Sequence, residues 1–386
     1  MVETRNMIGS GDLGNSTTKL MIENDTIKQP SVIKRIFSKP AATELETAKN
    51  VANLFEQLVV HITSPALKRD GLFLVGSRAN AQADADNMNI KLGNKHKHDI
   101  PVVMSLGLTA AYAVRKSYEE AKELPASLSI NMKYTSAIPA SEYNITKAQF
   151  LEHRFLDNEH VVIVYVGDRP VTVTINYEKV KVTQEGVPAL YALIDSSADI
   201  LDEYAELYGK ESKTASFSKL NTFHVDIGDG TTEYIYMQGM NPVNDACSGE
   251  RRGVGHATEE AIGMLQEELH GNLAGINRQQ FMDMVRDSGH RLHKEAAKCL
   301  KEARYSQAQR ILEDIIEKYQ TKTNGNVDAI IVYGGGSIEF KDDMYEDLLD
   351  FAKEVRCEVL WIPAAYAVDM NVRGMDTLNK KVLYKG

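Results

Sequence analysis

The chain has few cysteines and no long run of apolar residues. Cys247, Cys299 and Cys357 are the only cysteines among 386 residues, and their odd number and wide spacing argue against a disulfide framework or a zinc knuckle. No segment approaches the roughly 18 consecutive apolar residues of a membrane span, and the first ten residues lack the apolar stretch of a secretory signal. These absences predict a protein of the reducing cytoplasm without a membrane anchor.

Basic residues are outnumbered by acidic ones. The 44 lysines and arginines face 54 aspartates and glutamates, so the formal net charge is −10. Proteins that bind DNA or RNA directly present a basic face to the phosphates, so we expect no direct binding of nucleic acid. The chain length permits two or more domains, and a hydrophobic content of 43% is enough for a packed core.

Short apolar runs alternate with segments whose apolar residues recur every three to four positions, and this alternation predicts an α/β fold. The predicted strands cover residues 127–134, 161–166, 171–177, 223–227, 234–237, 329–333 and 359–362. The predicted helices cover residues 50–61, 259–270, 278–305 and 307–319. Polar composition predicts surface loops at residues 83–99 and 209–221.

Glycines near the N-terminus have the spacing of a dinucleotide-binding fingerprint. Gly9, Gly11 and Gly14 spell G-x-G-x-x-G, but that fingerprint requires a helix to begin at the last glycine. Residues 19–22 are instead apolar and partly β-branched, which favours a strand. The stretch therefore predicts a β-hairpin whose turn could hold an anion.

The same pattern occurs a second time in the chain. DLGNSTTK at residues 12–19 aligns without gaps with DIGDGTTE at residues 226–233, and this repeat predicts two related halves. Backbone N–H groups of a turn rich in Gly, Ser and Thr can form a concave anion site, although an isolated copy is more often an ordinary hairpin turn. The candidate phosphate-binding residues are Gly14, Asn15, Ser16, Thr17 and Lys19 in the first copy, and Gly228, Asp229, Gly230 and Thr231 in the second.

The leading aspartates of the two copies are candidate magnesium ligands. Mg²⁺ typically keeps several waters and uses one or two carboxylates, so Asp12 and Asp226 could hold it, mainly through water. Lys19 would supply a positive charge to the phosphates.

A third glycine cluster follows the predicted strand at residues 329–333. Gly334, Gly335 and Gly336 would allow a flat purine to approach the backbone closely, and Ser337 is predicted to be the N-cap of the next helix. Turns of this kind also occur in α/β folds for packing alone.

Taken together, these motifs resemble those of the actin superfamily, and in particular the plasmid-segregation actins of the ParM type. VKVTQEGVPALYAL at 180–193 resembles the connecting segment of that family, which implies that Glu185 orients or deprotonates the attacking water. RGVGHATEEAI at 252–262 resembles a helix start near the nucleoside, including Gly253, and residues 363–375 resemble the second connecting helix.

The resemblance implies an actin-like, ribonuclease H-like α/β fold, in which two lobes with mixed sheets flank a nucleotide cleft. Domain I would comprise residues 1–186 and 362–386, and domain II residues 187–361. Asp226 and Glu185 would be the catalytic residues, and the cofactors would be Mg²⁺ with ATP, or alternatively GTP.

The function implied is an ATPase that polymerises into filaments and segregates plasmid or other mobile DNA. A ParR-type adaptor on a centromere-like site would connect the filament to its cargo. The alternative is a sugar or acid kinase of the same fold. His96, His98, His290 and His293 have no neighbouring metal-ligand pattern, so we expect them to be solvated.

Overall fold

The computed structural model describes residues 3–42, 44–82, 84–88, 94–209, 211–273 and 275–384. The chain forms two compact units. Unit 1 comprises Met1–Ile138, Glu142–Tyr191 and Asn371–Gly386, and unit 2 comprises Pro139–Ser141 and Ala192–Met370. The predicted domain boundaries differ from these at residues 139–141, 187–191 and 362–370.

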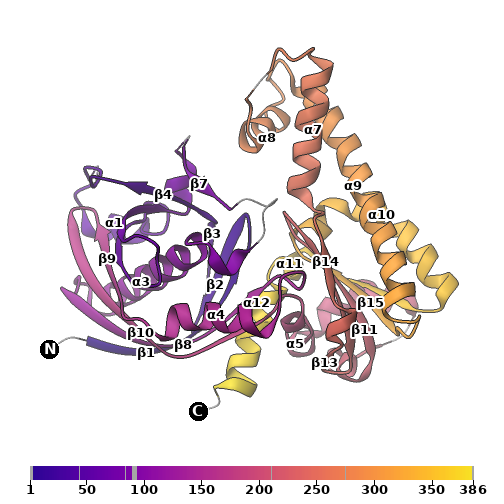
Figure 1. Cartoon of the computed structure of the whole chain (residues 1–386), viewed down its shortest axis with the longest axis horizontal. Helices are drawn as coiled ribbons and strands as arrows, with labels where there is room; N and C mark the ends of the chain where they lie inside the picture. The colour runs from indigo at the N-terminus through magenta and orange to yellow at the C-terminus, as the bar shows by residue number, and fades with distance from the viewer. Residues whose placement is uncertain are drawn as a thin grey trace. The chain divides into compact units, whose positions relative to one another are not determined.

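Unit 1 contains a ten-stranded mixed sheet with the order β3-β2-β1-β8-β10-β9-β5-β6-β4-β7 (Figure 1). Its central strands β1, β8 and β10 are parallel, and the other pairs are antiparallel. The strands are β1 (Glu3–Leu13), β2 (Thr17–Ile22), β3 (Asp25–Pro30), β4 (Val32–Ile36), β5 (Val59–Thr63), β6 (Gly71–Val75), β7 (Asp86–Asn87), β8 (Ser127–Ile138), β9 (His160–Val166) and β10 (Arg169–Gln184).

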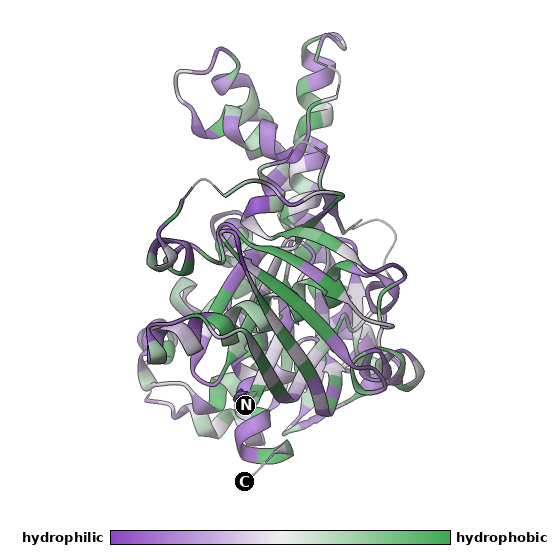
Figure 2. Ribbon diagram, turned by 90° about the vertical axis from the view of Figure 1, so that its left-hand side faces the viewer, coloured by the Kyte–Doolittle hydropathy of each residue, from purple (hydrophilic) through white to green (hydrophobic). Residues whose placement is uncertain are grey.

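Helix α3 (Ile100–Ala121) forms much of the core of unit 1 because most of its residues are buried against the sheet. Several strands of this sheet that face the viewer in Figure 2 carry long hydrophobic stretches. The other helices are α1 (Thr47–Ala52), α2 (Ser77–Asn80), α4 (Ile145–Leu156), α5 (Val187–Asp195), which continues into unit 2, and α12 (Met370–Leu378), with a 3-10 turn at Lys95–Lys97 and a π-helical turn at Asn379–Leu383.

Unit 2 contains a six-stranded sheet with the order β13-β12-β11-β15-β16, in which β14 also pairs with β12. Its strands are β11 (Asn221–Ile227), β12 (Thr232–Gln238), β13 (Asn241–Pro242), β14 (Ser248–Glu250), β15 (Ala329–Tyr333) and β16 (Glu358–Trp361). Helices α7, α8 and part of α9 extend away from this sheet (Figure 1). The helices are α6 (Asp202–Tyr208), α7 (Val254–Glu268), α8 (Arg278–Arg286), α9 (His293–Lys322), α10 (Gly335–Val355) and α11 (Ala364–Ala367), with 3-10 turns at Ala198–Leu201, Thr214–Lys219 and Asn244–Ala246.

All seven predicted strands are present, but two predicted helices are wrong in part. The helix predicted at 50–61 ends at Ala52, and its last residues belong to β5, where they pair with β6 and β9. The helix predicted at 278–305 is interrupted at 287–292. Helix α9 then runs without a break through the rest of that segment and through the helix predicted at 307–319. Residues 209–221, predicted as a surface loop, include a 3-10 turn whose Phe217 is buried. No helix in the described ranges is long and apolar enough to span a bilayer.

Candidate functional site

The first repeat forms the predicted hairpin between β1 and β2, and Ser31 holds its turn. The Ser31 amide donates to the carbonyl of Ser16 at 2.9 Å, and the Ser31 hydroxyl donates to the carbonyl of Gly14 at 2.6 Å. Within the described chain, the amides of Asn15 and Ser16 donate to no protein group. The turn therefore directs its carbonyls toward Ser31 and leaves two amides available to a ligand.

Two charged side chains flank this turn on the paired strands. Asp12 and Lys19 are opposite each other in the ladder, and Lys19 Nζ lies 2.9 Å from Asp12 Oδ2. Asp12 is 6% exposed. The structure thus brings Asp12, Lys19 and residues 14–17 together at one end of the β1–β2 hairpin.

The second repeat forms the predicted hairpin between β11 and β12, and the start of α7 holds its turn. The amides of Val254 and Gly255 donate to the carbonyls of Gly228 and Asp229 at 3.3 and 2.9 Å. His256 Nε2 donates to the carbonyl of Gly230 at 3.0 Å.

The amides of this second turn divide between a closing hydrogen bond and open donors. The Gly228 amide donates to the Thr231 carbonyl at 2.9 Å and closes the turn. In the ranges that the structure describes, the amides of Asp229, Gly230 and Thr231 donate to no protein group. As in the first turn, the carbonyls accept hydrogen bonds from the protein, and adjacent amides have no protein acceptor among the described residues.

Three glycines allow other parts of unit 2 to approach the second turn. A Cβ on Gly253 would lie 2.5 Å from the carbonyl oxygens of Gly228 and Asp229. A Cβ on Gly334, whose φ is +92°, would lie 2.4 Å from the carbonyl oxygen of Ile227, and one on Gly336 would lie 2.5 Å from its Cγ2. These glycines are therefore required for backbone packing around the turn.

Gly335 differs from its two neighbours because a Cβ there would meet no atom within 4 Å. The absence of a side chain at Gly335 leaves space at the first turn of α10, where a purine could approach. The prediction that Ser337 caps this helix is wrong, because Gly334 is the N-cap and Ser337 lies inside the first turn. The buried Ser337 hydroxyl donates to the Gly334 carbonyl at 2.8 Å.

Glu185 lies at the end of β10 and forms an ion pair with Lys95. The two side chains are largely buried, since Lys95 is 5% and Glu185 9% exposed. Lys95 has no recognisable signal in the sequence, because it lies in the segment 83–99, whose polar composition predicts a surface loop. His96 is also buried, at 3% exposed, so the prediction that it is solvated is wrong.

Burial and neighbouring charges act in opposite directions on this ion pair. Burial raises the pKa of Glu185, the Lys95 ammonium offsets part of that rise, and Asp12 and Glu142 add to it. Burial by itself would lower the pKa of Lys95, but the carboxylates of Glu185, Asp12 and Glu142 outweigh it and raise that pKa. Asp12 and Glu185 thus belong to one electrostatic cluster in unit 1.

No group of three or more His, Cys, Asp or Glu side chains arranged to hold a metal ion occurs in the described ranges. A pre-formed structural metal site is therefore absent from that part of the chain. Single aspartates on each turn nevertheless fit Mg²⁺, which is commonly held by one or two carboxylates together with substrate phosphates and water.

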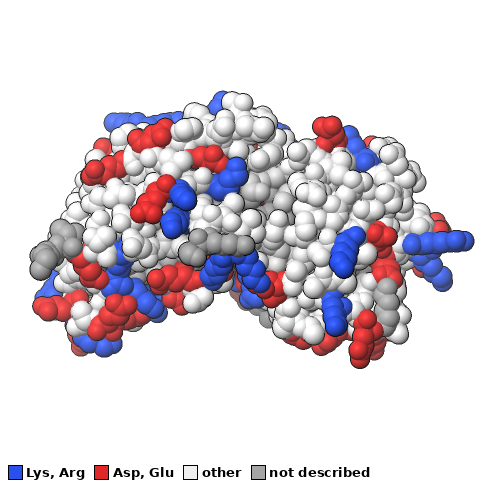
Figure 3. Space-filling view, turned by 90° about the horizontal axis from the view of Figure 1, so that it is seen from below, with Lys and Arg blue, Asp and Glu red and all other residues white. Residues whose placement is uncertain are grey.

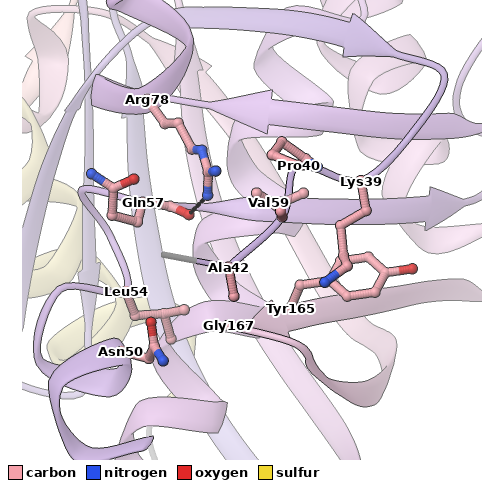
Figure 4. A pocket seen from close by; sticks show the side chains of 11 residues that line it. Lys39, Pro40, Ala42, Asn50, Leu54, Gln57, Val59, Arg78, Tyr165 and Gly167 are labelled. Atoms are coloured by element: carbon pink, nitrogen blue, oxygen red, sulfur yellow. Dashed lines mark hydrogen bonds between the residues drawn. The ribbon is translucent and has the colours of Figure 1, made fainter. Parts of the chain in front are cut away.

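Two cavities in unit 1 are poor alternatives for a nucleotide site. One, lined by Lys39, Arg78 and Tyr165 among others, measures about 50 Å³, and Arg78 donates to the Gln57 carbonyl across it (Figure 4). The other measures about 390 Å³ and is lined by Tyr112 and charged residues of β3 and α3. Neither cavity is lined by a residue of the two turns. On the face of the molecule shown in Figure 3, acidic and basic side chains are interspersed.

Comparison with known proteins places these features in a known fold. Actin-like protein Alp7A superimposes with a TM-score of 0.70 at 16% identity, over 97% of this chain and 96% of that one. Bacillus thuringiensis ParM with ATP gives 0.62 at 14% identity over 98% and 99%, and a non-polymerisable quadruple mutant of pCBH ParM gives 0.63 at 17% over 96% and 98%. These similarities show that the fold is actin-like.

The actin-like fold confirms the predicted fold class and the resemblance found in the sequence. Residues 224–346 also match the family described as archaeal actin homologue MreB-like, C-terminal. That segment contains the second turn, the start of α7 and the cluster Gly334–Ser337, whereas the first turn lies outside it. A search of curated protein sequences found no match.

Proposed function

We propose that the chain is an actin-like ATPase that assembles into nucleotide-dependent filaments. The observation that carries this proposal is the repeated turn, in which the carbonyls are engaged by the protein and adjacent amides are left without a protein acceptor. Such amides are suited to phosphate oxygens, because they present several donors to one anion. A nucleotide is the ligand that combines several phosphates with a flat base suited to the space beside Gly335.

Each predicted residue has a defined part in this proposal. Asn15, Ser16 and Thr17 of the first turn and Asp229, Gly230 and Thr231 of the second bind phosphate oxygens. Lys19 contributes positive charge, and Asp12 and Asp226 hold Mg²⁺ through water. Gly14, Gly228 and Gly253 shape the turns, Gly335 leaves space for the base, and Gly334, Gly336 and Ser337 hold the backbone beside that space.

Hydrolysis in this proposal depends on placing one water molecule against the terminal phosphate. Glu185 is the one carboxylate of its cluster that directly follows a strand of the central sheet and is held by a buried cation. Glu185 would orient the water and accept its proton, and Mg²⁺ held by Asp12 and Asp226 would supply positive charge to the phosphates. Phosphoryl transfer of this kind depends chiefly on positioning and on charge stabilisation.

The cellular role we propose is segregation of plasmid or other mobile DNA in the cytoplasm. The filament would contact its DNA through an adaptor of the ParR type, because a chain with a net charge of −10 is poorly suited to bind DNA itself. Filament growth requires a heterologous contact between copies that does not close into a ring. With this charge on every subunit, added salt or Mg²⁺ should strengthen assembly by screening repulsion.

The test combines sedimentation and electron microscopy in ATP, GTP and the two diphosphates, with phosphate release measured in parallel. We expect polymer and phosphate release with a triphosphate and Mg²⁺, and neither with Asp226→Ala. Absence of polymer together with transfer of phosphate to a sugar or acid would replace this proposal with the kinase.

A further inference from the structure

We propose that Lys95 is a positioning residue that holds Glu185 ionised and aimed for hydrolysis. This inference rests on the proposed function, because it assigns Lys95 a role in the reaction of that site. Lys95 and Glu185 are 90 positions apart in the sequence, and both are almost completely buried. A buried charged pair is costly unless both partners are held in place, so its surroundings show how firmly this one is fixed.

The backbone that carries Lys95 is fixed by the side chains of Glu142 and Arg154. The Glu142 carboxylate accepts the amides of Asn94 at 2.8 Å and Lys95 at 3.0 Å. On the C-terminal side of Lys95, the Arg154 guanidinium donates to the carbonyls of His96 and His98 at 3.0 and 2.7 Å. The turn is thus held on both sides of Lys95, so the ammonium group reaches Glu185 from a rigid base.

The backbone that carries Glu185 is also fixed. The Glu185 amide donates to the Ile138 carbonyl at 2.8 Å, which extends the pairing of β10 with β8. The next amide, of Gly186, donates to the side-chain oxygen of Asn371 at 3.0 Å. Because both partners are anchored through the backbone, loss of the Lys95 ammonium cannot be offset by a small shift of the chain.

Lys95 is the ammonium paired with Glu185, whereas the other groups acting most strongly on this carboxyl, Asp12 and Glu142, are negative. Without Lys95, burial and two neighbouring carboxylates would all favour the protonated form of Glu185. A protonated Glu185 cannot accept a proton from water. An opposite charge in direct contact with a carboxylate typically lowers the pKa of that carboxyl by about 1–3 units.

The experiment compares wild type with Lys95→Met, Lys95→Arg and the control Lys97→Met. Lys97 is the exposed lysine of the same 3-10 turn, so its variant tests the loss of a charge outside the pair. For Lys95→Met we expect nucleotide affinity to change little and hydrolysis at pH 7 to fall at least about tenfold. The acidic limb of its pH profile should move up by about one unit or more. Lys95→Arg should keep the profile near that of wild type, and Lys97→Met should match wild type.

A second measurement uses no nucleotide and follows Glu185 itself. The infrared band of the Glu185 carboxylic acid is isolated by subtracting the spectrum of the same chain carrying Glu185→Gln. We expect this band to persist to higher pH in Lys95→Met than in wild type. An unshifted band, or a lower rate with an unshifted pH profile, would overturn the positioning role. A shifted band in a chain that does not hydrolyse ATP would instead support the pair and refute the proposed function.

Discussion

The turn between β1 and β2 and the turn between β11 and β12 share a sequence pattern, but different parts of the chain hold them. In the first, one residue, Ser31, engages two carbonyls with its amide and its hydroxyl. In the second, two backbone amides at the start of α7 and the ring of His256 engage three carbonyls. Both turns have the same arrangement of donors and acceptors, because their carbonyls accept hydrogen bonds from the protein and adjacent amides have no protein acceptor in the part of the chain that the structure describes.

This difference indicates that the repeated pattern specifies the hairpin and the direction of its amides, whereas the anchor is specific to each unit. The second turn depends on close backbone approach and therefore on glycines at 253, 334 and 336. The first turn is held by the amide and the hydroxyl of Ser31, and a Cβ on its Gly14 would lie 2.6 Å from the carbonyl oxygen of Thr17 in the same turn. The two turns should therefore respond differently to substitution.

The largest effect is expected for Gly334→Ala in unit 2. Alanine at this position would have to adopt a φ of +92°. Its Cβ would also lie 2.4 Å from the Ile227 carbonyl oxygen and 2.6 Å from Asp226 Oδ1. The unusual conformation costs about 1–3 kcal/mol, and the overlap adds a similar amount. Chemical denaturation should show a loss of several kcal/mol.

The matched control for that change is Gly335→Ala, one residue along the chain. Its Cβ would meet no atom within 4 Å, so unfolding should remain close to that of wild type. If a base approaches this backbone, the same variant should still bind nucleotide more weakly. Equal stability of Gly334→Ala and Gly335→Ala would contradict the role of backbone packing in the second turn.

Removal of the leading aspartates should have the next largest effect, and on ligand binding more than on folding. For Asp226→Asn we expect the affinity for nucleotide in Mg²⁺ to fall about 10–100-fold, the range for a hydrogen bond to a charged group. Asp12→Asn should have a similar effect and should also weaken the contact with Lys19. Calorimetry with and without Mg²⁺ measures the affinity of both variants. If each variant loses as much affinity without Mg²⁺ as with it, the aspartates do not act through the metal.

The two hairpins could be predicted from sequence because their information is local. An aspartate and a glycine between two apolar runs, repeated without gaps, specify strand, turn and strand within about eight residues. The glycine cluster after β15 was also recognisable, although its main contribution is to packing rather than to a ligand. Gly334 and Gly336 approach a turn about 100 residues earlier in the chain, and sequence spacing does not encode which partner a glycine faces.

The features that were missed depend on distant contacts. Lys95 lies in a polar segment typical of an exposed loop, and it is buried because Glu142, Arg154 and Glu185 bind that segment. The helix predicted over 50–61 failed for a similar reason. Leu58 and Val59 fit a helical period, but pairing with β6 and β9 places residues 59–63 in a strand, and such tertiary pairing overrides local preference.

A smaller effect is expected for Ser31→Ala, which removes the side-chain part of the first anchor. The hydroxyl donates to the Gly14 carbonyl and also lies 2.8 Å from the Thr18 hydroxyl, so its loss leaves a partly buried carbonyl without that donor. We expect unfolding to become easier by about 1–2 kcal/mol and nucleotide affinity to fall several-fold. Hydrogen exchange should increase at residues 14–18 and stay unchanged at 228–231, and an increase at both would contradict independent anchoring.

The smallest effect is expected for Arg278→Ala, which removes the salt bridge to Asp229 in the second turn. Arg278 Nη1 lies 2.8 Å from Asp229 Oδ2, but both side chains are partly exposed, and exposed pairs contribute about 0–1 kcal/mol. Because the carbonyls of this turn are held by the start of α7, its amides should keep their direction, and nucleotide affinity should change less than in Ser31→Ala. Titration of both variants with the same nucleotide measures the two affinities. If Arg278→Ala weakens binding as much as Ser31→Ala does, the second turn depends on a side chain as strongly as the first does. The two turns would then not differ in how they are anchored.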